Sequence, residues 1–217
     1  MKNLLHKAVA TMLPLVLQTK NKQRLSILTY HRILPSLDYM RPTEPTASEF
    51  EWQMELLRHY FNPLSLSDAM SLMDYGELPE RAVCITFDDG YADNELVALP
   101  LLKRWNIPAT VFVTTGFLNG GRMWNDSVIE ALRIAAGDVF DLSGIGLGVY
   151  DISDIAHRRS AAETIIREIK HWPPQQRADT VEAIVSLVGT LPTDLMMSDV
   201  QVRHLYESGV DIVAHTK

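Results

Sequence analysis

Short apolar runs recur along this chain and are separated by amphipathic segments. Four of the runs have the length and the apolar character of strands: 25–30, 82–87, 109–113 and 210–214. The run at 82–87, AVCITF, is apolar at nearly every position, which is typical of a strand buried on both faces. The pattern therefore predicts about four strands, with at least one in the middle of a sheet.

The segments between these runs have helical spacing. We expect helices over 46–59 with Ser48 as its cap, over 66–75 with Ser67 as its cap, over 94–105, and over 198–208, which Ser198 caps and Gly209 ends. Strands that alternate with helices in this way predict an α/β fold with a parallel sheet or a barrel.

The alternation stops after Gly116. Helical spacing then occupies 127–136, 161–172 and 175–188, while 138–153 is irregular and contains glycines. We therefore predict a helical insertion over about residues 117–197 within a domain that spans 25–217. A closed α/β barrel needs about eight strands, so we expect a partial barrel with an open sheet edge that invites self-association.

Composition narrows the class of protein. The 217 residues include 20 Lys and Arg against 27 Asp and Glu, a net charge of −7, and no clustered basic surface for nucleic acid is expected. The one cysteine, Cys84, excludes an internal disulfide framework and a multi-cysteine zinc site. It lies in the middle of an apolar run, and we expect an inert core residue.

Residues 1–24 are the candidate targeting segment. Two lysines precede an apolar stretch at 8–17, which is too short to cross a bilayer, and no small-x-small cleavage site follows it. Apolar residues at helical spacing favour an amphipathic helix over a signal peptide. The location of the protein stays open, with a cytoplasmic or membrane-associated site favoured over export.

The residues with the clearest chemistry are in Thr86-Phe87-Asp88-Asp89-Gly90-Tyr91, directly after the second strand. Active sites of α/β proteins form at the carboxyl ends of parallel strands. Adjacent carboxylates repel each other, and a cation or a shared proton relieves that cost. Capping of the helix that begins at Asn94 is the alternative role for Asp88, Asp89 or Asp93. An aspartyl-nucleophile phosphatase is disfavoured, because Gly90 stands where its second aspartate belongs.

A histidine, His215, also ends a strand, in GVDIVAHT. Together with TFDDGY, PATVFV and LTYHRILP, this segment resembles the NodB-type polysaccharide deacetylases. The resemblance covers residues 25–217 and implies a deformed α/β barrel, a divalent metal ion, most simply zinc, and hydrolysis of N- or O-acetyl groups on an acetylated polysaccharide or oligosaccharide. It implies that Asp88 is the general base, that Asp89 is a metal ligand, and that His215 begins an H-[ST]-x-x-H metal motif.

That motif's second histidine would fall at position 219, and the family's later motifs, including its general acid, are absent from the 217 residues. We therefore expect the N-terminal part of a deacetylase that is inactive and binds zinc weakly by itself. The alternatives are a non-catalytic remnant that binds polysaccharide or a partner chain, an assembly of copies through the open edge, and hydrolysis of a non-sugar amide.

Four further residues are candidate substrate contacts. His31 follows the first strand, and Tyr91 adjoins the paired carboxylates. Trp124 and Asn125 are candidates for a sugar groove, because aromatic faces pack against pyranose rings. The alternatives are packing for His31 and Tyr91, and for Asn125 the capping of the helix at Ser127, a role that Asp126 could equally fill.

Overall fold

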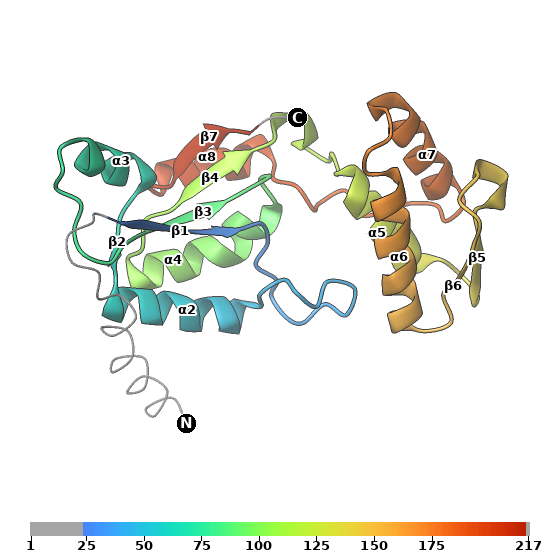
Figure 1. The fold of residues 1–217 in the computed structure, drawn as a ribbon, viewed down its shortest axis with the longest axis horizontal. Coiled ribbons are helices and arrows are strands. Elements are labelled where there is room, and N and C mark those ends of the chain that lie inside the picture. The colour runs from blue at the N-terminus through green and yellow to red at the C-terminus, as the bar shows by residue number, and fades with distance from the viewer. Residues whose placement is uncertain (1–23, 216–217) are drawn as a thin grey trace, which may run out of the picture. The chain divides into compact units, whose positions relative to one another are not determined.

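The computed structural model describes residues 24–215 (Figure 1). The chain divides into two compact units. One, here called the sheet unit, comprises Met1–Ser36, Glu44–Thr115 and Met197–Lys217, and the other, the helical unit, comprises Leu37–Thr43 and Gly116–Met196. The expected amphipathic segment at 1–24 lies outside the described residues except for Arg24.

The sheet unit contains a parallel sheet in the order β1-β3-β4-β7, with β2 paired to the first residues of β3 (Figure 1). Its strands are β1 (Leu25–Tyr30), β2 (Asn62–Pro63), β3 (Ala82–Phe87), β4 (Thr110–Val113) and β7 (Asp211–Ala214). This arrangement confirms the predicted α/β class with a mostly parallel sheet. The two-residue strand β2 was not predicted, since so short a run carries no periodicity.

The helices of this unit follow the predicted order: α2 (Ala47–Tyr60), α3 (Leu66–Asp74), the π-helical turn η1 (Asn94–Ala98), α4 (Leu99–Trp105) and α8 (Asp199–Glu207). Two predicted caps are wrong. The side chain of Thr46, not Ser48, accepts from the backbone of Glu49, and Ser65, not Ser67, caps α3. Ser198 caps α8 as predicted.

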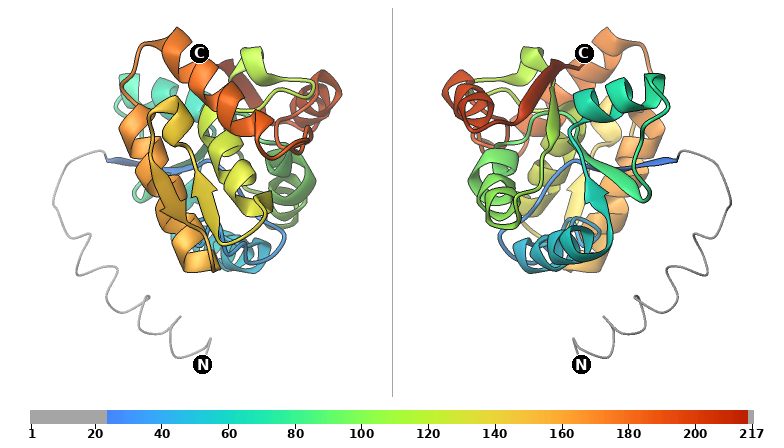
Figure 2. Two further views of the ribbon diagram at one scale, coloured as in Figure 1. Left: turned by 90° about the vertical axis from the view of Figure 1, so that its right-hand side faces the viewer. Right: turned by 90° about the vertical axis from the view of Figure 1, so that its left-hand side faces the viewer.

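Strand β3 is buried at all six positions. On one face Phe87 packs against Tyr30 of β1 and Phe50 of α2, with ring centroids 5.6 and 5.9 Å from Phe87. On the other face Ala82 and Cys84 pack against Ala69 of α3. Because alternate residues of a strand point to opposite faces, helices α2 and α3 cover opposite sides of β3 (Figure 2).

Both outer strands of this sheet have a free edge within residues 24–215. Side chains on them are open to solvent, with Ile27 49% and Leu28 38% exposed on β1 and Val213 42% exposed on β7. The predicted open edge is therefore present on both sides of the described sheet.

The helical unit contains α5 (Trp124–Ile134), α6 (Ile155–Ile169), α7 (Pro174–Ser186), a short 3-10 turn at Ser143–Ile145, and a hairpin of β5 (Val139–Asp141) and β6 (Val149–Asp151). Another 3-10 turn, Thr115–Phe117, begins at the last residue of the middle segment of the sheet unit. The hairpin corrects the expectation that 138–153 is irregular. Apolar residues of α5, α6 and α7 form one core with Phe140 and Ile152. Among the described helices, none combines the length and apolar content needed to cross a membrane.

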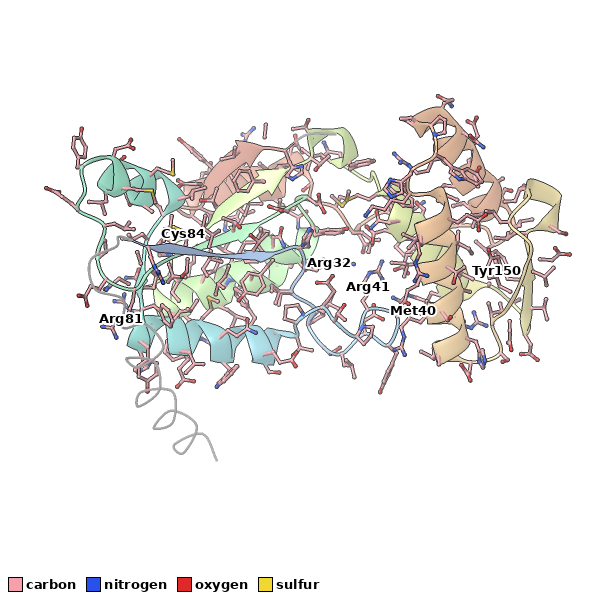
Figure 3. The ribbon with its side chains drawn as sticks, viewed as in Figure 1. Arg32, Met40, Arg41, Arg81, Cys84 and Tyr150 are labelled. Carbon is pink, nitrogen blue, oxygen red and sulfur yellow. The ribbon has the colours of Figure 1, made fainter. Side chains whose placement is uncertain are left out.

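A buried ionic network also holds this unit together. Arg41 donates to Oδ1 of Asp126 at 2.8 Å and to Oε1 of Glu130 at 2.6 Å (Figure 3 labels Arg41). Arg133 bridges Glu130 and Asp38. The network therefore ties segment 37–43 to helix α5.

Candidate active site

The paired carboxylates lie in a tight turn at the carboxyl end of β3. The Asp88 amide donates to the Tyr30 carbonyl at 2.9 Å, which extends the β1–β3 ladder by one bond. Asp89 then has φ +74°, a left-handed conformation that is uncommon outside glycine but is tolerated by Asp and Asn. Its carbonyl accepts the Thr114 amide at 3.1 Å, so the turn is also fixed to the end of β4.

Gly90 completes this turn and has little room. Its φ is +84°, and a Cβ atom placed on it would lie 3.2 Å from Cγ1 of Val113 and 3.5 Å from Cε of Met197. Its carbonyl accepts the Met197 amide at 3.0 Å. The sequence needs glycine here both for the backbone conformation and for the close approach of β4.

His31 lies at the same edge of the sheet, because β1 and β3 are parallel with Tyr30 opposite Phe87. Its Nε2 is 4.0 Å from Oδ2 of Asp89. The His31 side chain is 54% exposed and that of Asp89 is 15% exposed, so the imidazole is open to solvent while the carboxylate is largely covered. The structure therefore brings together two residues that the sequence predicted for the site.

Behind this pair lies a set of buried polar side chains. Nε of Arg32 donates to Oδ2 of Asp93 at 2.8 Å, and Oδ1 of Asp93 accepts the Ile33 amide at 3.1 Å (Figure 3 labels Arg32). The side-chain amide of Asn94 donates to the His31 carbonyl at 2.9 Å. Tyr91 is 4% exposed, with the Arg32 guanidinium carbon 4.8 Å from its ring centre. This favours the packing alternative for Tyr91.

His215 directly follows β7 and lies at the same carboxyl edge of the sheet. Its amide donates to the Val113 carbonyl at 2.9 Å, and its ring centre lies 6.5 Å from that of Phe112. Strand β4 lies between β3 and β7, so the ends that carry Asp89 and His215 are separated by one strand. Within residues 24–215, no three His, Cys, Asp or Glu side chains are close enough to form a metal-binding group.

Trp124 and Asn125 belong to the helical unit. They are the first two residues of α5, so neither Asn125 nor Asp126 caps a helix that starts at Ser127, and that alternative is wrong. Trp124 packs against the core of this unit, and the Arg177 guanidinium carbon lies 4.9 Å from the centre of its ring. Asp126 is 2% exposed and pairs with Arg41.

Two features of the sheet unit were missed from sequence. One is the Arg32–Asp93 pair, whose signal was the DDGYADN segment, where polar residues continue past the two carboxylates. The other is the contact of His204 with Glu95. Nδ1 of His204 lies 2.6 Å from Oε1 of Glu95, which joins α8 to η1. No local pattern signals a contact between residues this far apart in sequence.

The segment that carries the paired carboxylates is similar in sequence to known proteins. Residues 75–137 match the sequence model of the polysaccharide deacetylase family. This segment is similar to the polysaccharide deacetylases. It contains Asp88, Asp89, Gly90 and Tyr91 and ends in the helical unit, just beyond α5.

Two curated proteins illustrate the similarity. YxkH of Bacillus subtilis (strain 168), whose name assigns it provisionally to the polysaccharide deacetylases, is 34% identical over 99 residues, 45% of this chain and 34% of its own length. A poly-beta-1,6-N-acetyl-D-glucosamine N-deacetylase of Staphylococcus aureus (strain MSSA476) is 34% identical over 84 residues, 38% of this chain and 29% of its own length. The matched region thus spans about a third of these curated relatives.

Solved structures with a similar arrangement include a de-N-acetylase from Aggregatibacter actinomycetemcomitans, with a TM-score of 0.46 and 19% identity over 88% of this chain and 54% of that one. IcaB from Ammonifex degensii has a TM-score of 0.41 and 20% identity over 90% of this chain and 92% of its own.

Proposed function

We propose that the turn at Asp88 and Asp89 is the active site of a metal-dependent hydrolase that removes acetyl groups from a carbohydrate polymer. The supporting observation is that both carboxylates lie at the carboxyl edge of a parallel sheet, inside the segment 75–137 that matches the deacetylase family. The named activity of the Staphylococcus aureus relative makes an N-acetylated glucosamine polymer the first substrate to test.

The donor types at this edge fit a divalent ion such as Zn²⁺. Asp89 would hold it through a carboxylate oxygen, with an imidazole of His215 as the second ligand. Carboxylate and imidazole are donors that zinc takes, and a bound zinc ion lowers the pKa of water and polarises a carbonyl group. The place of Asp89 directly after β3, at the carboxyl edge of the parallel sheet, supports this role.

Asp88 would then act as general base. It would accept a proton from the water that attacks the acetyl carbonyl carbon, and acetate and a free amine or hydroxyl group would be released. His31 is the imidazole nearest to Asp89 and is exposed, which supports it as a contact for the substrate. Substrate contacts by Tyr91, Trp124 and Asn125 stay predictions.

The experiment is acetate release from oligomers of β-1,6-linked N-acetylglucosamine by the protein expressed from its native gene. Asp88→Asn should lower kcat by about 10²–10⁴-fold, the usual contribution of a general base. The matched control is Asp211→Asn, the same change at the amino end of β7, which should leave the rate unchanged. A chelator should abolish the activity and zinc should restore it.

The result that would contradict this function is wild-type acetate release that neither Asp88→Asn nor the chelator reduces. Binding of the oligomer without any hydrolysis, and weakened by Trp124→Ala, would favour the non-catalytic alternative. The inactivity of residues 1–217 by themselves stays a prediction, which the same assay on that chain tests.

We also propose that the open edges of the sheet pair with further strands, including those of a second copy. The exposed apolar side chains of Ile27 and Leu28 support this, because β1 is an outer strand of the sheet that residues 24–215 form. Sedimentation should then show association that increases with concentration, and Ile27→Lys should weaken it. A monomer at every concentration would contradict it.

A further inference from the structure

We propose that Arg32, Asp93 and Asn94 form a clamp that sets the distance between His31 and Asp89. Because Asp89 is the proposed metal ligand, the catalytic importance of this clamp rests on the proposed function. The three are positioning residues, since Asp93 and Asn94 act on the site through the segment 31–33, which includes Arg32. Their side chains are almost completely covered: Arg32 is 9%, Asp93 7% and Asn94 1% exposed.

The clamp bonds to three consecutive residues after β1. Asn94 donates to the carbonyl of His31, Asp93 pairs with the side chain of Arg32, and Asp93 accepts the amide of Ile33. Within the clamp, Asn94 Nδ2 is also 3.4 Å from Oδ1 of Asp93. Strand β1 has ended at Tyr30, so no sheet ladder holds these residues. Their conformation therefore depends on the clamp.

The turn that carries Asp88 and Asp89 is also held by backbone hydrogen bonds, one of them to the end of β1. Asp88 bonds to the Tyr30 carbonyl, and the turn that carries Asp89 is held by Thr114. Asp93 and Asn94 follow Asp89 in the sequence by only four and five positions. The backbone amide of Asn94 donates to the Tyr91 carbonyl at 3.0 Å, which holds this short stretch in a turn. One short stretch of chain thus carries Asp89 and also grips the backbone of His31, so the distance between the two side chains is set locally.

A role limited to packing does not account for these bonds. A buried ion pair costs desolvation energy that apolar residues of similar volume would avoid, so Arg32 and Asp93 are weak evidence for stability alone. Their geometry is directional: each bond ends on a backbone or side-chain atom of residues 31–33. What they supply is a fixed backbone at His31, from which the imidazole extends toward Asp89.

The test is a spectroscopic measurement of the contact, independent of metal and of catalysis. Histidine ring signals are recorded by NMR at one fixed pH, with that of His31 assigned through His31→Gln. In the otherwise unchanged chain, Asp89→Asn should shift the ring signals of His31. In the Asn94→Ala background this response should fall by roughly half or more, because the loop that carries His31 is released.

The matched control is Asn62→Ala, which removes another asparagine amide that donates to a backbone carbonyl, that of Glu80 at 2.7 Å. The response of His31 should be unchanged in that background. If Asn94→Ala does not fold, Asp93→Asn serves instead, since it keeps the size of the side chain and removes the charge that pairs with Arg32.

A full response in the folded Asn94→Ala or Asp93→Asn background would overturn the clamp. So would the absence of any His31 response to Asp89→Asn in the unchanged chain, because the two side chains would then not meet. Neither result affects the proposed function, which acetate release tests separately.

Discussion

Nε2 of His31 lies 4.0 Å from Oδ2 of Asp89, although the two residues come from different strand ends of the sheet. The parallel pairing of β1 with β3 puts both residues at one edge. The left-handed backbone of Asp89 and the buried bonds to residues 31–33 then determine how the side chains approach. The site is therefore built from sheet register first and from local turn geometry second.

Gly90→Ala should destabilise the sheet unit. The left-handed conformation alone costs an L-residue about 1–2 kcal/mol, and the new Cβ would also press on Cγ1 of Val113 at 3.2 Å. Gly209→Ala is the matched control, because Gly209 has φ +86° and nothing within 4 Å of the added Cβ. Urea denaturation should show a larger loss for Gly90→Ala. Equal losses would mean that the contact with Val113 relaxes freely.

Arg41→Met should destabilise the helical unit by about 3–5 kcal/mol, because it removes a buried cation that pairs with two buried carboxylates, although Glu130 keeps its pair with Arg133. Those carboxylates belong to Asp126 and Glu130, 2% and 4% exposed. Arg104→Met is the control: it breaks an exposed pair with Glu51, worth about 0–1 kcal/mol. Thermal unfolding followed by circular dichroism compares them. A loss for Arg41→Met as small as that of the control would refute the structural role of the network.

Lowering the pH should reduce the stability of the helical unit, because the carboxylate of Asp38 becomes protonated. Burial raises the pKa of Asp38, but hydrogen bonds from Arg133 and the Met40 amide, with the charges of Arg133 and Arg41, outweigh it and lower that pKa below 3.8. A lowered folded-state pKa means that the stabilisation is present above the unfolded value and is lost as pH falls through the folded one.

Asp38→Asn should therefore reduce stability at neutral pH and flatten its dependence on pH below about 4. The measurement is the free energy of unfolding of both chains at a series of pH values. Parallel curves for the two chains would contradict the assigned role of Asp38.

Cys84 should resist thiol reagents in the folded protein. Its side chain is buried in β3, and burial, with the charge of Asp68, raises the pKa of its thiol to about 11. Because the thiolate is the reacting form, modification by a disulfide reagent should be slow until the chain is unfolded in guanidinium. Rapid reaction of the native chain would show that β3 opens or is exposed.

Much of the sheet was predictable because its strands are continuous apolar runs. The bounds of β1 and β3 were predicted without error, and β4 and β7 differ only by one residue at the start. The caps of α2 and α3 were assigned wrongly because two hydroxyl residues stand two positions apart at each helix start, and backbone conformation decides between them.

The ionic parts of the structure were not predictable from local sequence. Arg41 meets Asp126 and Glu130 across 85 and 89 positions, and no spacing rule joins residues so distant. The hairpin at 139–151 was missed because three-residue strands are too short to show alternation. At the site, the sequence indicated the carboxylates and His31, whereas the bonds of Asp93 and Asn94 emerged only from the fold.

Zinc titration by calorimetry tests whether Asp89 holds a divalent ion at the end of β3, as we propose. Asparagine tolerates the left-handed conformation of residue 89, so Asp89→Asn removes the charge with little change in the turn. We expect this variant to lose zinc affinity by about tenfold or more, while Asp211→Asn binds like the wild type. Unchanged zinc affinity in Asp89→Asn would contradict the proposed metal site.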